Sequence, residues 1–339
     1  MERRRIGRTG LEVTVLGFGC GPIGGLFEQV PDEQARAAVR AARDGGITYF
    51  DVAPFYGIGL AEHRLGEALR GRKNDFILST KVGRLLRPAA SGIPQETMFR
   101  EALPFEIVYD YTYDGIMRSV DDSCQRLGIP GADILYVHDV NRRWHGDAVD
   151  QRFREVMEGG YRALEKLRAA GAVKAIGVGV NDPDILVHFA EAGDFDCFML
   201  AGRYTLLEQT PLEKLFPVCE KRGISIVAAG PFNSGILATG VKPGARYFYS
   251  EAAPGILDKT GRIEKVCARH GVPLAAAALQ FALGHPVVAS VATGMVSSQE
   301  VEVNLRHMAQ IIPQDFWLEL KREGLLRQET PLPRTMSAA

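Results

Sequence analysis

Residues 47–81 read ITYFDVAPFYGIGLAEHRLGEALRGRKNDFILSTK, and this stretch contains the unit that repeats along the chain. A short apolar run, Ile47–Asp51, precedes the segment Ala61–Leu69, in which apolar residues recur three and four positions apart, and a second run follows at Phe76–Lys81. Such runs predict β-strands, and the spacing between them predicts an amphipathic helix. A strand, a helix and a strand in this order indicate a parallel βαβ unit.

The same alternation continues along the chain in both directions. Eight strands are predicted, at Val13–Gly19, Ile47–Asp51, Phe76–Lys81, Asp133–His138, Lys174–Gly179, Asp196–Leu200, Ser225–Ala229 and Val287–Ala292. The helices are predicted at Asp32–Arg43, Ala61–Leu69, Asp114–Leu127, Tyr161–Ala170, Asp184–Glu191, Leu212–Lys221, Ile263–His270 with Leu274–Leu283, and Gln299–Met308. Eight similar units without a linker favour a single α/β domain, a closed (β/α)8 TIM barrel, over a doubly wound sheet with a second domain.

Three segments lie outside this repeat. A glycine-containing turn at Arg8–Leu11 predicts an N-terminal β-hairpin, residues 1–14, that plugs the bottom of the barrel. Residues 311–339 are expected to form a C-terminal extension with a helix between Pro313 and Leu326. The connection 82–113 is unusually long and rich in aromatic residues, so we expect it to cover the substrate. We expect residues 1–339 to form one domain.

Charge and composition narrow the classes of partner. The chain has 40 basic and 41 acidic residues, so its net charge of −1 argues against binding nucleic acid or an anionic membrane surface. Neither the N-terminus nor Pro273–Leu283 carries an apolar stretch long enough for a signal or a membrane span. We expect a cytoplasmic protein that acts on small molecules. The sequence does not indicate its oligomeric state. The five cysteines form no C-x-x-C pair, which indicates reduced thiols rather than a metal site or disulfides.

One glycine motif points to a different fold. Residues 19–24 match the dinucleotide-binding pattern G-x-G-x-x-G after a predicted strand. In a Rossmann fold the third glycine opens the helix, whereas here the helix is predicted to begin only at about Asp32 and Pro22 lies within the turn. We therefore interpret this segment as a loop above the first strand.

Ionisable side chains fall at the ends of three consecutive strands, where a barrel builds its active site. Asp51, Lys81 and His138 close strands two, three and four, and Tyr56 follows in a short loop. An aspartate and a lysine in one apolar mouth must pair, and a lysine beside a phenol lowers the pKa of that phenol. Tyr56 is then expected to act as general acid or base, with His138 orienting the substrate oxygen. Such a set moves protons only, so a hydride-carrying cofactor is required. A Schiff base on Lys81, as in aldolases, is the alternative chemistry.

Several motifs resemble the signature of the aldo-keto reductase superfamily. They are Asp51-Val-Ala-Pro-Phe-Tyr56-Gly57, Gly59-Leu-Ala-Glu62, Ser79-Thr-Lys81-Val82 and Tyr136-Val-His138, and the resemblance runs from about Arg4 to Asn304. It implies that Tyr56 is the proton donor or acceptor and that Asp51, Lys81 and His138 complete a catalytic tetrad. It also implies a nicotinamide cofactor bound across the barrel mouth without a Rossmann domain.

The resemblance further implies where that cofactor is held. The expected contacts are Gly179, Asn181, Gly230, Pro231, Phe232, Asn233, Ser234, Gly235, Leu237, Gly294, Ser297, Gln299, Glu300 and Asn304. At the end of strand seven, where the family has an aromatic residue that stacks on the nicotinamide, this chain has Ala229. Residues 293–304 contain no Lys or Arg, and Glu300 stands near the expected ribose 2′ position, which favours NAD over NADP. Alternatively, Glu300 does not bind the cofactor and is present because acidic residues are favoured in the first turn of a helix.

Within the superfamily, Asp110–Ser119 resembles sugar dehydrogenases that act on L-fucose, L-galactose or D-threo-aldoses. The resemblance implies oxidation of the hemiacetal carbon of a cyclic aldose to a lactone, with Tyr56 as general base. Pyridoxal 4-dehydrogenase, which makes 4-pyridoxolactone by the same chemistry, is similar and remains an alternative. A non-catalytic, cofactor-binding regulatory subunit is the alternative from another class. The residues expected to contact the substrate are Phe55, Tyr113, Trp144 and Arg203, and no metal site is expected.

Overall fold

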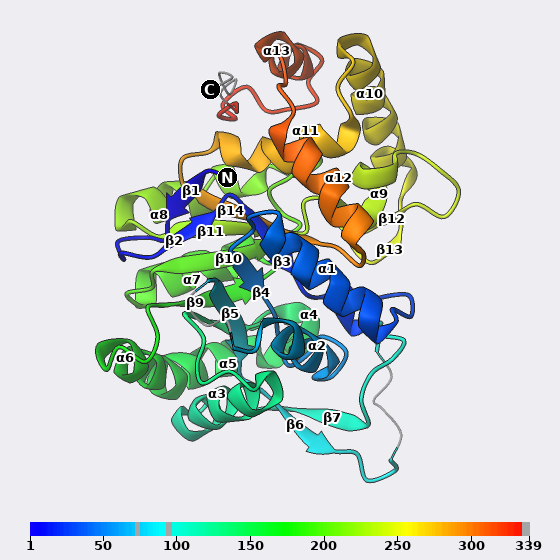
Figure 1. Cartoon of the computed structure of the whole chain (residues 1–339). Coiled ribbons are helices and arrows are strands. Elements are labelled where there is room, and N and C mark those ends of the chain that lie inside the picture. The colour runs from blue at the N-terminus through cyan, green and yellow to red at the C-terminus, as the bar shows by residue number, and fades with distance from the viewer. Residues whose placement is uncertain (72–74, 93–96, 334–339) are drawn as a thin grey trace.

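The barrel predicted from the repeat is present. The structure is a computed structural model that describes residues 1–71, 75–92 and 97–333. Eight parallel strands, each paired with its neighbours in chain order, close into a barrel (Figure 1). They are β3 (Leu16–Gly19), β4 (Tyr49–Asp51), β5 (Ile77–Val82), β8 (Ile134–His138), β9 (Ala175–Val180), β10 (Cys197–Ala201), β11 (Ser225–Ala229) and β14 (Val288–Gly294). The prediction of a (β/α)8 fold is therefore confirmed.

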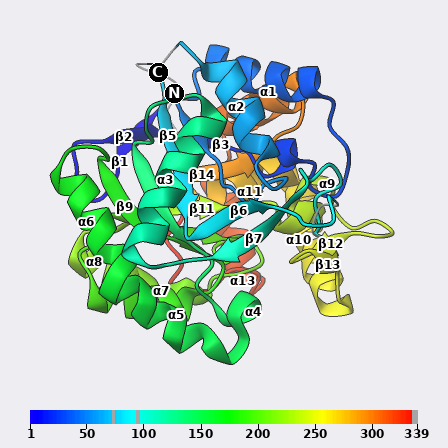
Figure 2. The same ribbon diagram turned by 90° about the horizontal axis from the view of Figure 1, so that it is seen from below.

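Helices surround the barrel, as Figure 2 shows from a second direction. The longer ones are α1 (Asp32–Asp44), α2 (Leu60–Leu69), α3 (Tyr113–Leu127), α6 (Tyr161–Ala169), α7 (Pro183–Ala192), α8 (Leu215–Arg222), α10 (Pro254–His270), α11 (Leu274–Phe281), α12 (Ser298–Ala309) and α13 (Gln314–Arg322). In α1 the buried residues are Ala35, Ala38, Val39 and Ala42, so one apolar stripe faces the barrel. Short helices that were not predicted, α4 (Arg142–His145), α5 (Val149–Glu155) and α9 (Ile236–Thr239), lie in the connections after strands.

Capping residues explain two of the helix starts. The hydroxyl of Thr112 accepts a hydrogen bond of 3.1 Å from the backbone N–H of Gly115 at the start of α3. The carboxylate of Asp182 accepts one of 3.1 Å from the N–H of Asp184 at the start of α7. Each bond satisfies a backbone donor that has no partner within the helix. α10 begins nine residues before the predicted Ile263, because Pro254 suits the first position of a helix.

The N-terminal hairpin is present as predicted, but the first barrel strand begins later than the predicted Val13. β1 (Arg3–Arg5) and β2 (Glu12–Thr14) form an antiparallel pair, and the barrel strand starts only at Leu16, so residues 13–19 are not one strand. The Arg4 guanidinium donates hydrogen bonds of 2.9 Å to the carbonyls of Leu283 and Val288, next to the start of β14. The hairpin therefore closes the face of the barrel where the strands begin, on the left in Figure 1.

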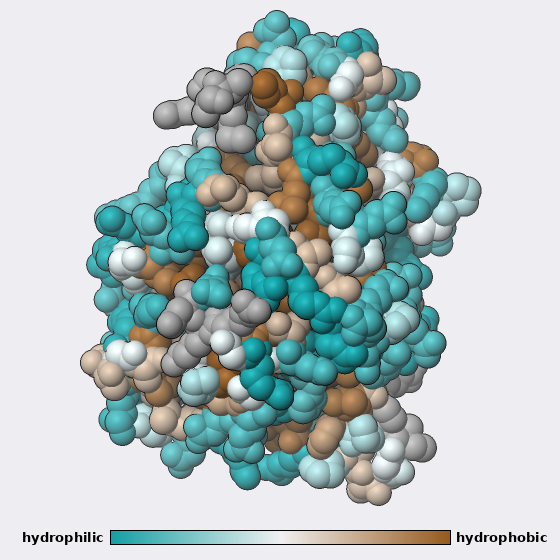
Figure 3. Space-filling view, in the orientation of Figure 1, coloured by the Kyte–Doolittle hydropathy of each residue, from teal (hydrophilic) through white to brown (hydrophobic). Residues whose placement is uncertain are grey.

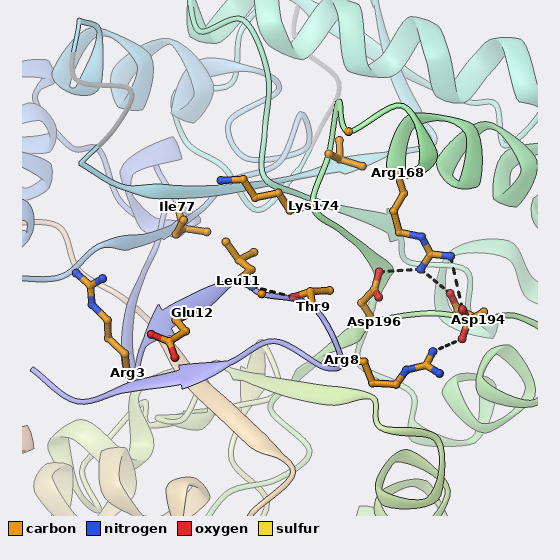
Figure 4. A pocket seen from close by; sticks show the side chains of 13 residues that line it. Arg3, Arg8, Thr9, Leu11, Glu12, Ile77, Arg168, Lys174, Asp194 and Asp196 are labelled. Atoms are coloured by element: carbon orange, nitrogen blue, oxygen red, sulfur yellow. Dashed lines mark hydrogen bonds and ion pairs between the residues drawn. The ribbon is translucent and has the colours of Figure 1, made fainter.

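A pocket opens beside this hairpin, and four of its charged side chains pair with one another (Figure 4). Arg168 donates a hydrogen bond of 2.9 Å to the Asp196 carboxylate, and Arg8 forms an ion pair with Asp194. The Arg8–Asp194 pair ties the turn of the hairpin to the segment before β10, and the Arg168–Asp196 pair ties α6 to the same segment. We interpret the pocket as part of the structural closure of the barrel floor.

The long connection between β5 and α3 contains more regular structure than expected. β6 (Arg84–Pro88) and β7 (Phe105–Tyr109) form a two-stranded antiparallel sheet, which extends from the lower edge of the molecule in Figure 1. A second small pair, β12 (Arg246–Tyr247) and β13 (Ser250–Glu251), lies on the side of the barrel opposite the N-terminal hairpin. Both small sheets thus belong to connections that leave the C-terminal ends of barrel strands.

The surface drawn in Figure 3 is mostly hydrophilic, with hydrophobic atoms scattered between the polar ones. Within the described residues, no single helix is long and apolar enough to cross a membrane, although α10 and α11, bent by 105°, meet the length and composition criteria together. All five cysteines are free, and four of them are buried. Burial raises the pKa of the Cys219 and Cys267 thiols to about 12, so these two stay protonated at neutral pH.

Candidate active site

A cavity of about 440 Å³ opens at the C-terminal ends of the barrel strands. Its lining includes the four side chains predicted to carry the chemistry: Asp51 at the end of β4, Tyr56 in the following loop, Lys81 in β5 and His138 at the end of β8. Because neighbouring parallel strands end at the same rim, residues far apart in the sequence are brought together. The structure therefore gathers the predicted tetrad in one place.

Asp51 and Lys81 form a buried ion pair. Lys81 Nζ donates to Asp51 Oδ2 over 2.7 Å and to the carbonyl of Val52 over 3.0 Å. Ser79 Oγ donates to the other carboxylate oxygen over 2.6 Å, and Ser79 in turn lies 3.0 Å from the Tyr49 hydroxyl. Burial raises the pKa of Asp51, while Lys81 and Ser79 oppose that rise. This network fixes the lysine beside Tyr56.

The expectation that Lys81 lowers the pKa of Tyr56 is wrong for the chain alone. Lys81 Nζ lies 4.8 Å from the centre of the Tyr56 ring, but burial, and after it the Asp51 carboxylate, raise the pKa of this phenol well above its usual value. Asp51 pairs with the lysine at 2.7 Å, so its negative charge offsets part of the effect of the lysine on the phenol. Tyr56 is accordingly a neutral phenol here.

His138 is a neutral imidazole. Burial, with help from Arg84 and Lys81, holds its pKa well below the usual value. Among the described residues its Nδ1 has no hydrogen-bond partner, although it is buried, and its ring is edge-on to Tyr56 with centroids 6.2 Å apart. A buried nitrogen without a partner is costly, so it indicates a position where a bound molecule completes the site.

A second ion pair lies next to His138, and sequence reasoning missed it. The Arg84 side chain is fully buried and donates to Asp139 Oδ2 over 2.5 Å. The same carboxylate oxygen lies 3.4 Å from His138 Nε2. Asp139 also has φ of +54°, which a residue other than glycine adopts only under constraint. An aspartate directly after the predicted histidine was the available signal, but its partner could not be read from the sequence.

Most of the predicted cofactor residues line the cavity. They are Gly179, Asn181, residues 230–235, Gly294 and Glu300, and Ala229 lies among them at the end of β11. Asn181 Oδ1 accepts a hydrogen bond of 3.0 Å from Asn141, which was not predicted. Leu237, Ser297, Gln299 and Asn304 do not line it: Leu237 is in the core, and the other three belong to the start or the interior of α12.

The start of α12 shows how Glu300 is held. Ser297 is the N-cap and accepts a hydrogen bond of 3.2 Å from the backbone N–H of Glu300. Glu300 Oε2 in turn accepts one of 2.9 Å from the N–H of Val296. This reciprocal arrangement is a capping box, so one oxygen of Glu300 has a structural role while the residue also lines the cavity.

Local features of the cavity fit an extended dinucleotide. Asn233 and Ser234 both have positive φ, at +46° and +63°, and Gly235 follows at +104°, so the loop after β11 turns sharply at the cavity wall. Asn233 Oδ1 and Thr293 Oγ1 are buried without partners among the described residues. A Cβ on Gly179 would lie 3.5 Å from Lys81 Cε and would fill space beside the lysine. These features leave polar atoms and room for a ligand.

Two of the four predicted substrate residues line the cavity. The rings of Phe55 and Trp144 meet edge to face with centroids 5.2 Å apart. Arg203 lies in a smaller neighbouring pocket, where it stacks 3.9 Å from the centre of the Phe248 ring. Tyr113 is at the start of α3, outside the cavity.

Further aromatic residues, which were not among the four predicted substrate contacts, complete the walls of the cavity. They are Phe27, Phe99, Phe248 and Tyr249. Phe99 belongs to the long connection 82–113, so part of the predicted cover is in place, although residues 93–96 lie outside the described residues. Phe27 and Tyr249 come from opposite ends of the chain, and their ring centroids are 6.2 Å apart. The aromatic run at residues 247–249 was the signal that could have indicated this wall.

Comparison with known proteins places this fold and site in a class. Residues 15–322 match the model of the aldo/keto reductase family, so the chain belongs to that family and is an oxidoreductase. It is 44% identical to pyridoxal 4-dehydrogenase of Microbacterium luteolum, over 96% of this chain and 98% of that protein. It is 40% identical to D-threo-aldose 1-dehydrogenase of a Pseudomonas species, over 94% and 96%. An aldo-keto reductase of Bacillus halodurans in its holo form superposes with a TM-score of 0.74 at 27% identity, over 95% and 96%.

Proposed function

We propose that the protein is an NAD-dependent dehydrogenase that oxidises the hemiacetal carbon of a cyclic aldose to a lactone. The observation that carries this proposal is the convergence of Tyr56, Lys81, Asp51 and His138 at one end of a cavity that is also lined by the turn at residues 230–235. Relatives at 44% and 40% identity are named for oxidations of a pyridoxal and of aldoses, which supports the same reaction class.

The residues divide the proton chemistry between them. The neutral His138 imidazole donates a hydrogen bond to the reacting oxygen and orients it beside the Tyr56 hydroxyl. Tyr56 accepts the proton of the hemiacetal hydroxyl, and the carbon loses a hydride as its C=O bond forms. Lys81, fixed by Asp51, stabilises the phenolate that Tyr56 must become for this step.

The cleft residues that would hold the cofactor are Asn181 for the carboxamide, residues 230–235 for the pyrophosphate and Glu300 for the ribose diol. When bound, NAD accepts the hydride, and the positive charge of its nicotinamide ring favours the phenolate form of Tyr56. Glu300 supports NAD over NADP because a carboxylate accepts hydrogen bonds from a diol and repels a phosphate.

The test is NADH formation with a panel of aldoses and pyridoxal, with NAD and NADP compared. We expect turnover of a cyclic aldose that falls at least about 1,000-fold in Tyr56→Phe, because the variant has no acceptor for the proton. Tyr204→Phe is the matched control, since it removes a buried hydroxyl that has no hydrogen-bond partner among the described residues and does not line the cavity.

Each contrary result selects an alternative. Turnover of pyridoxal with none of the aldoses would replace the substrate by the pyridoxal hemiacetal and leave the mechanism in place. Binding of NAD without turnover of any substrate would indicate the regulatory subunit. Trapping of a carbonyl substrate on Lys81 by borohydride would indicate the Schiff-base chemistry.

A further inference from the structure

The Arg84–Asp139 ion pair is buried at a cost that its contribution to stability does not explain. The guanidinium is 0% exposed and lies between two rings of the cavity wall, 4.3 Å from the centre of Phe55 and 4.6 Å from that of Trp144. Its Nε and Nη1 are buried without hydrogen-bond partners among the described residues. Burying an arginine in this way is expensive, and replacing such a pair by apolar residues is often neutral or stabilising. Stability therefore does not explain why the pair is present.

The backbone of Asp139 is held in place by two hydrogen bonds. The backbone N–H of Asp139 donates a hydrogen bond of 2.9 Å to the carbonyl of Gly179, and its own carbonyl accepts one of 2.9 Å from Asn141. These bonds maintain the unusual φ of +54°, which turns the chain at the end of β8. Backbone strain that is maintained in this way is typical of sites that fix a functional group.

The position of the carboxylate gives it access to a ligand. Asp139 lines the cavity, and its Oδ2 lies 3.4 Å from Nε2 of His138, the imidazole that would orient the reacting oxygen. None of the hydrogen bonds between the described residues involves the second carboxylate oxygen of Asp139, Oδ1. Hydroxyl groups on neighbouring carbons place their oxygens about one hydrogen-bond length apart. A hydroxyl next to the reacting oxygen therefore falls within reach of Asp139.

We propose that Asp139, held by Arg84, is a specificity-determining residue that accepts a hydrogen bond from the substrate's ring hydroxyl nearest to the reacting carbon. In an aldose this is the hydroxyl on C2; in the pyridoxal hemiacetal it is the phenolic 3-hydroxyl, which lies one carbon further from the reacting carbon. The inference rests on the proposed oxidation of a cyclic hemiacetal. Because the carboxylate only accepts, the site favours a donor at this position, and a substrate without one leaves the second carboxylate oxygen without that hydrogen bond.

The experiment compares the aldose that the wild-type enzyme oxidises with its 2-deoxy analogue. We expect kcat/KM of the wild type to fall about 10- to 100-fold for the analogue, as for the loss of a hydrogen bond to a charged group. In the double variant Asp139→Asn/Arg84→Gln, which leaves no unpaired charge, the two substrates should differ by less than about threefold. Asp147→Asn, a fully exposed aspartate in the same connection, is the matched control and should discriminate as the wild type does.

A measurement on the wild type covers the case in which the double variant does not fold. The 2-deoxy-2-fluoro analogue carries an acceptor in place of the donor, so its inhibition constant should be no lower than that of the 2-deoxy analogue. If pyridoxal is the substrate instead, 3-deoxypyridoxal takes the place of the 2-deoxy sugar and the same differences are expected.

The outcomes separate this inference from the proposed function. If no cyclic hemiacetal is oxidised, the proposed function fails. The proposed function stands if a substrate is oxidised and Tyr56→Phe abolishes its turnover. In that case the role of Asp139 alone is overturned by either of two results: the wild type oxidises the deoxy analogue equally well, or the double variant keeps the full discrimination. Unchanged NADH affinity in the double variant, measured by fluorescence, is expected in the supporting case, because the substrate half of the cavity alone is altered.

Discussion

The Lys81 ammonium lies 4.8 Å from the centre of the Tyr56 ring, yet the pKa of Tyr56 is raised. Burial of the phenol is the largest cause, and the next is the Asp51 carboxylate, which pairs with the lysine at 2.7 Å. The strength of Tyr56 as a base therefore depends on the balance between two opposite charges, and each can be removed separately.

Removing the charge of Asp51 and removing the charge of Lys81 should shift the pH dependence of oxidation in opposite directions. Oxidation needs the deprotonated phenol, so kcat/KM rises with pH as Tyr56 loses its proton. Asp51→Asn leaves Lys81 unpaired and lowers the pKa of Tyr56, so the rise moves to lower pH by about one unit; Lys81→Met moves it to higher pH. Lys174→Met, an exposed lysine at the opposite face of the barrel, should leave the profile unchanged. Shifts of the same sign in both active-site variants would contradict this electrostatic account.

The Asn141–Asn181 hydrogen bond leads to a prediction about cofactor affinity. Asn141 holds the amide of Asn181 at 3.0 Å and also caps α4 by accepting a hydrogen bond from the N–H of Trp144. Asn141→Ala removes both bonds, whereas Asn141→Ser retains a cap but is too short to reach Asn181. We expect both variants to weaken NADH binding about fivefold in a fluorescence titration. If the serine variant binds as the wild type does, the cap and not the Asn181 contact is what matters.

Glu300 should set the preference between the two cofactors. Glu300→Gln keeps an oxygen for the N–H of Val296 and removes only the charge, so the capping box is preserved. We expect the ratio of NADPH to NADH dissociation constants to fall about tenfold. Glu302→Gln, on the exposed face of the same helix, is the control. A ratio that does not change would assign Glu300 to helix capping alone.

The N-terminal hairpin should contribute strongly to stability because Gly7 lies close to the backbone of Asp196. Gly7 has φ of +51°, and a Cβ there would lie 2.2 Å from the backbone oxygen of Asp196. Gly7→Ala is expected to lower the free energy of unfolding by about 2 kcal/mol or more in urea. A Cβ on Gly10, in the same turn, would meet nothing within 4 Å. Gly10→Ala should therefore change the free energy of unfolding by less than about 0.5 kcal/mol. Equal stabilities of the two variants would show that the hairpin does not dock tightly.

The fold and the tetrad could be predicted because both follow from local patterns. The alternation of apolar runs and amphipathic segments defines the barrel, and the rule that parallel strands end at one rim then brings Asp51, Lys81 and His138 together. The end of the first barrel strand was also placed correctly. Its start was wrong, because residues 12–14 pair with Arg3–Arg5 in the hairpin, and the apolar run that begins at Val13 continues into β3 without a break that marks the boundary between the two strands.

What the sequence did not predict depends on contacts between connections. Arg84 belongs to the small sheet after β5 and Asp139 to the turn after β8, so their pairing is visible only once both connections are folded. Asn141 and Asn181 likewise meet across two neighbouring strand ends. The sign of the pKa shift of Tyr56 was mistaken for a related reason: it depends on how deeply the phenol is buried, which the spacing of charged residues does not reveal.

The hairpin at residues 3–14 places the start of the chain on the face of the barrel opposite the reaction cavity. A linker attached at Met1, which is half exposed, would therefore leave from the rear of the molecule. An enzyme anchored in this way to an electrode or a bead would present its open mouth to the surrounding solution, and genetic fusion at this end would leave the entrance unobstructed.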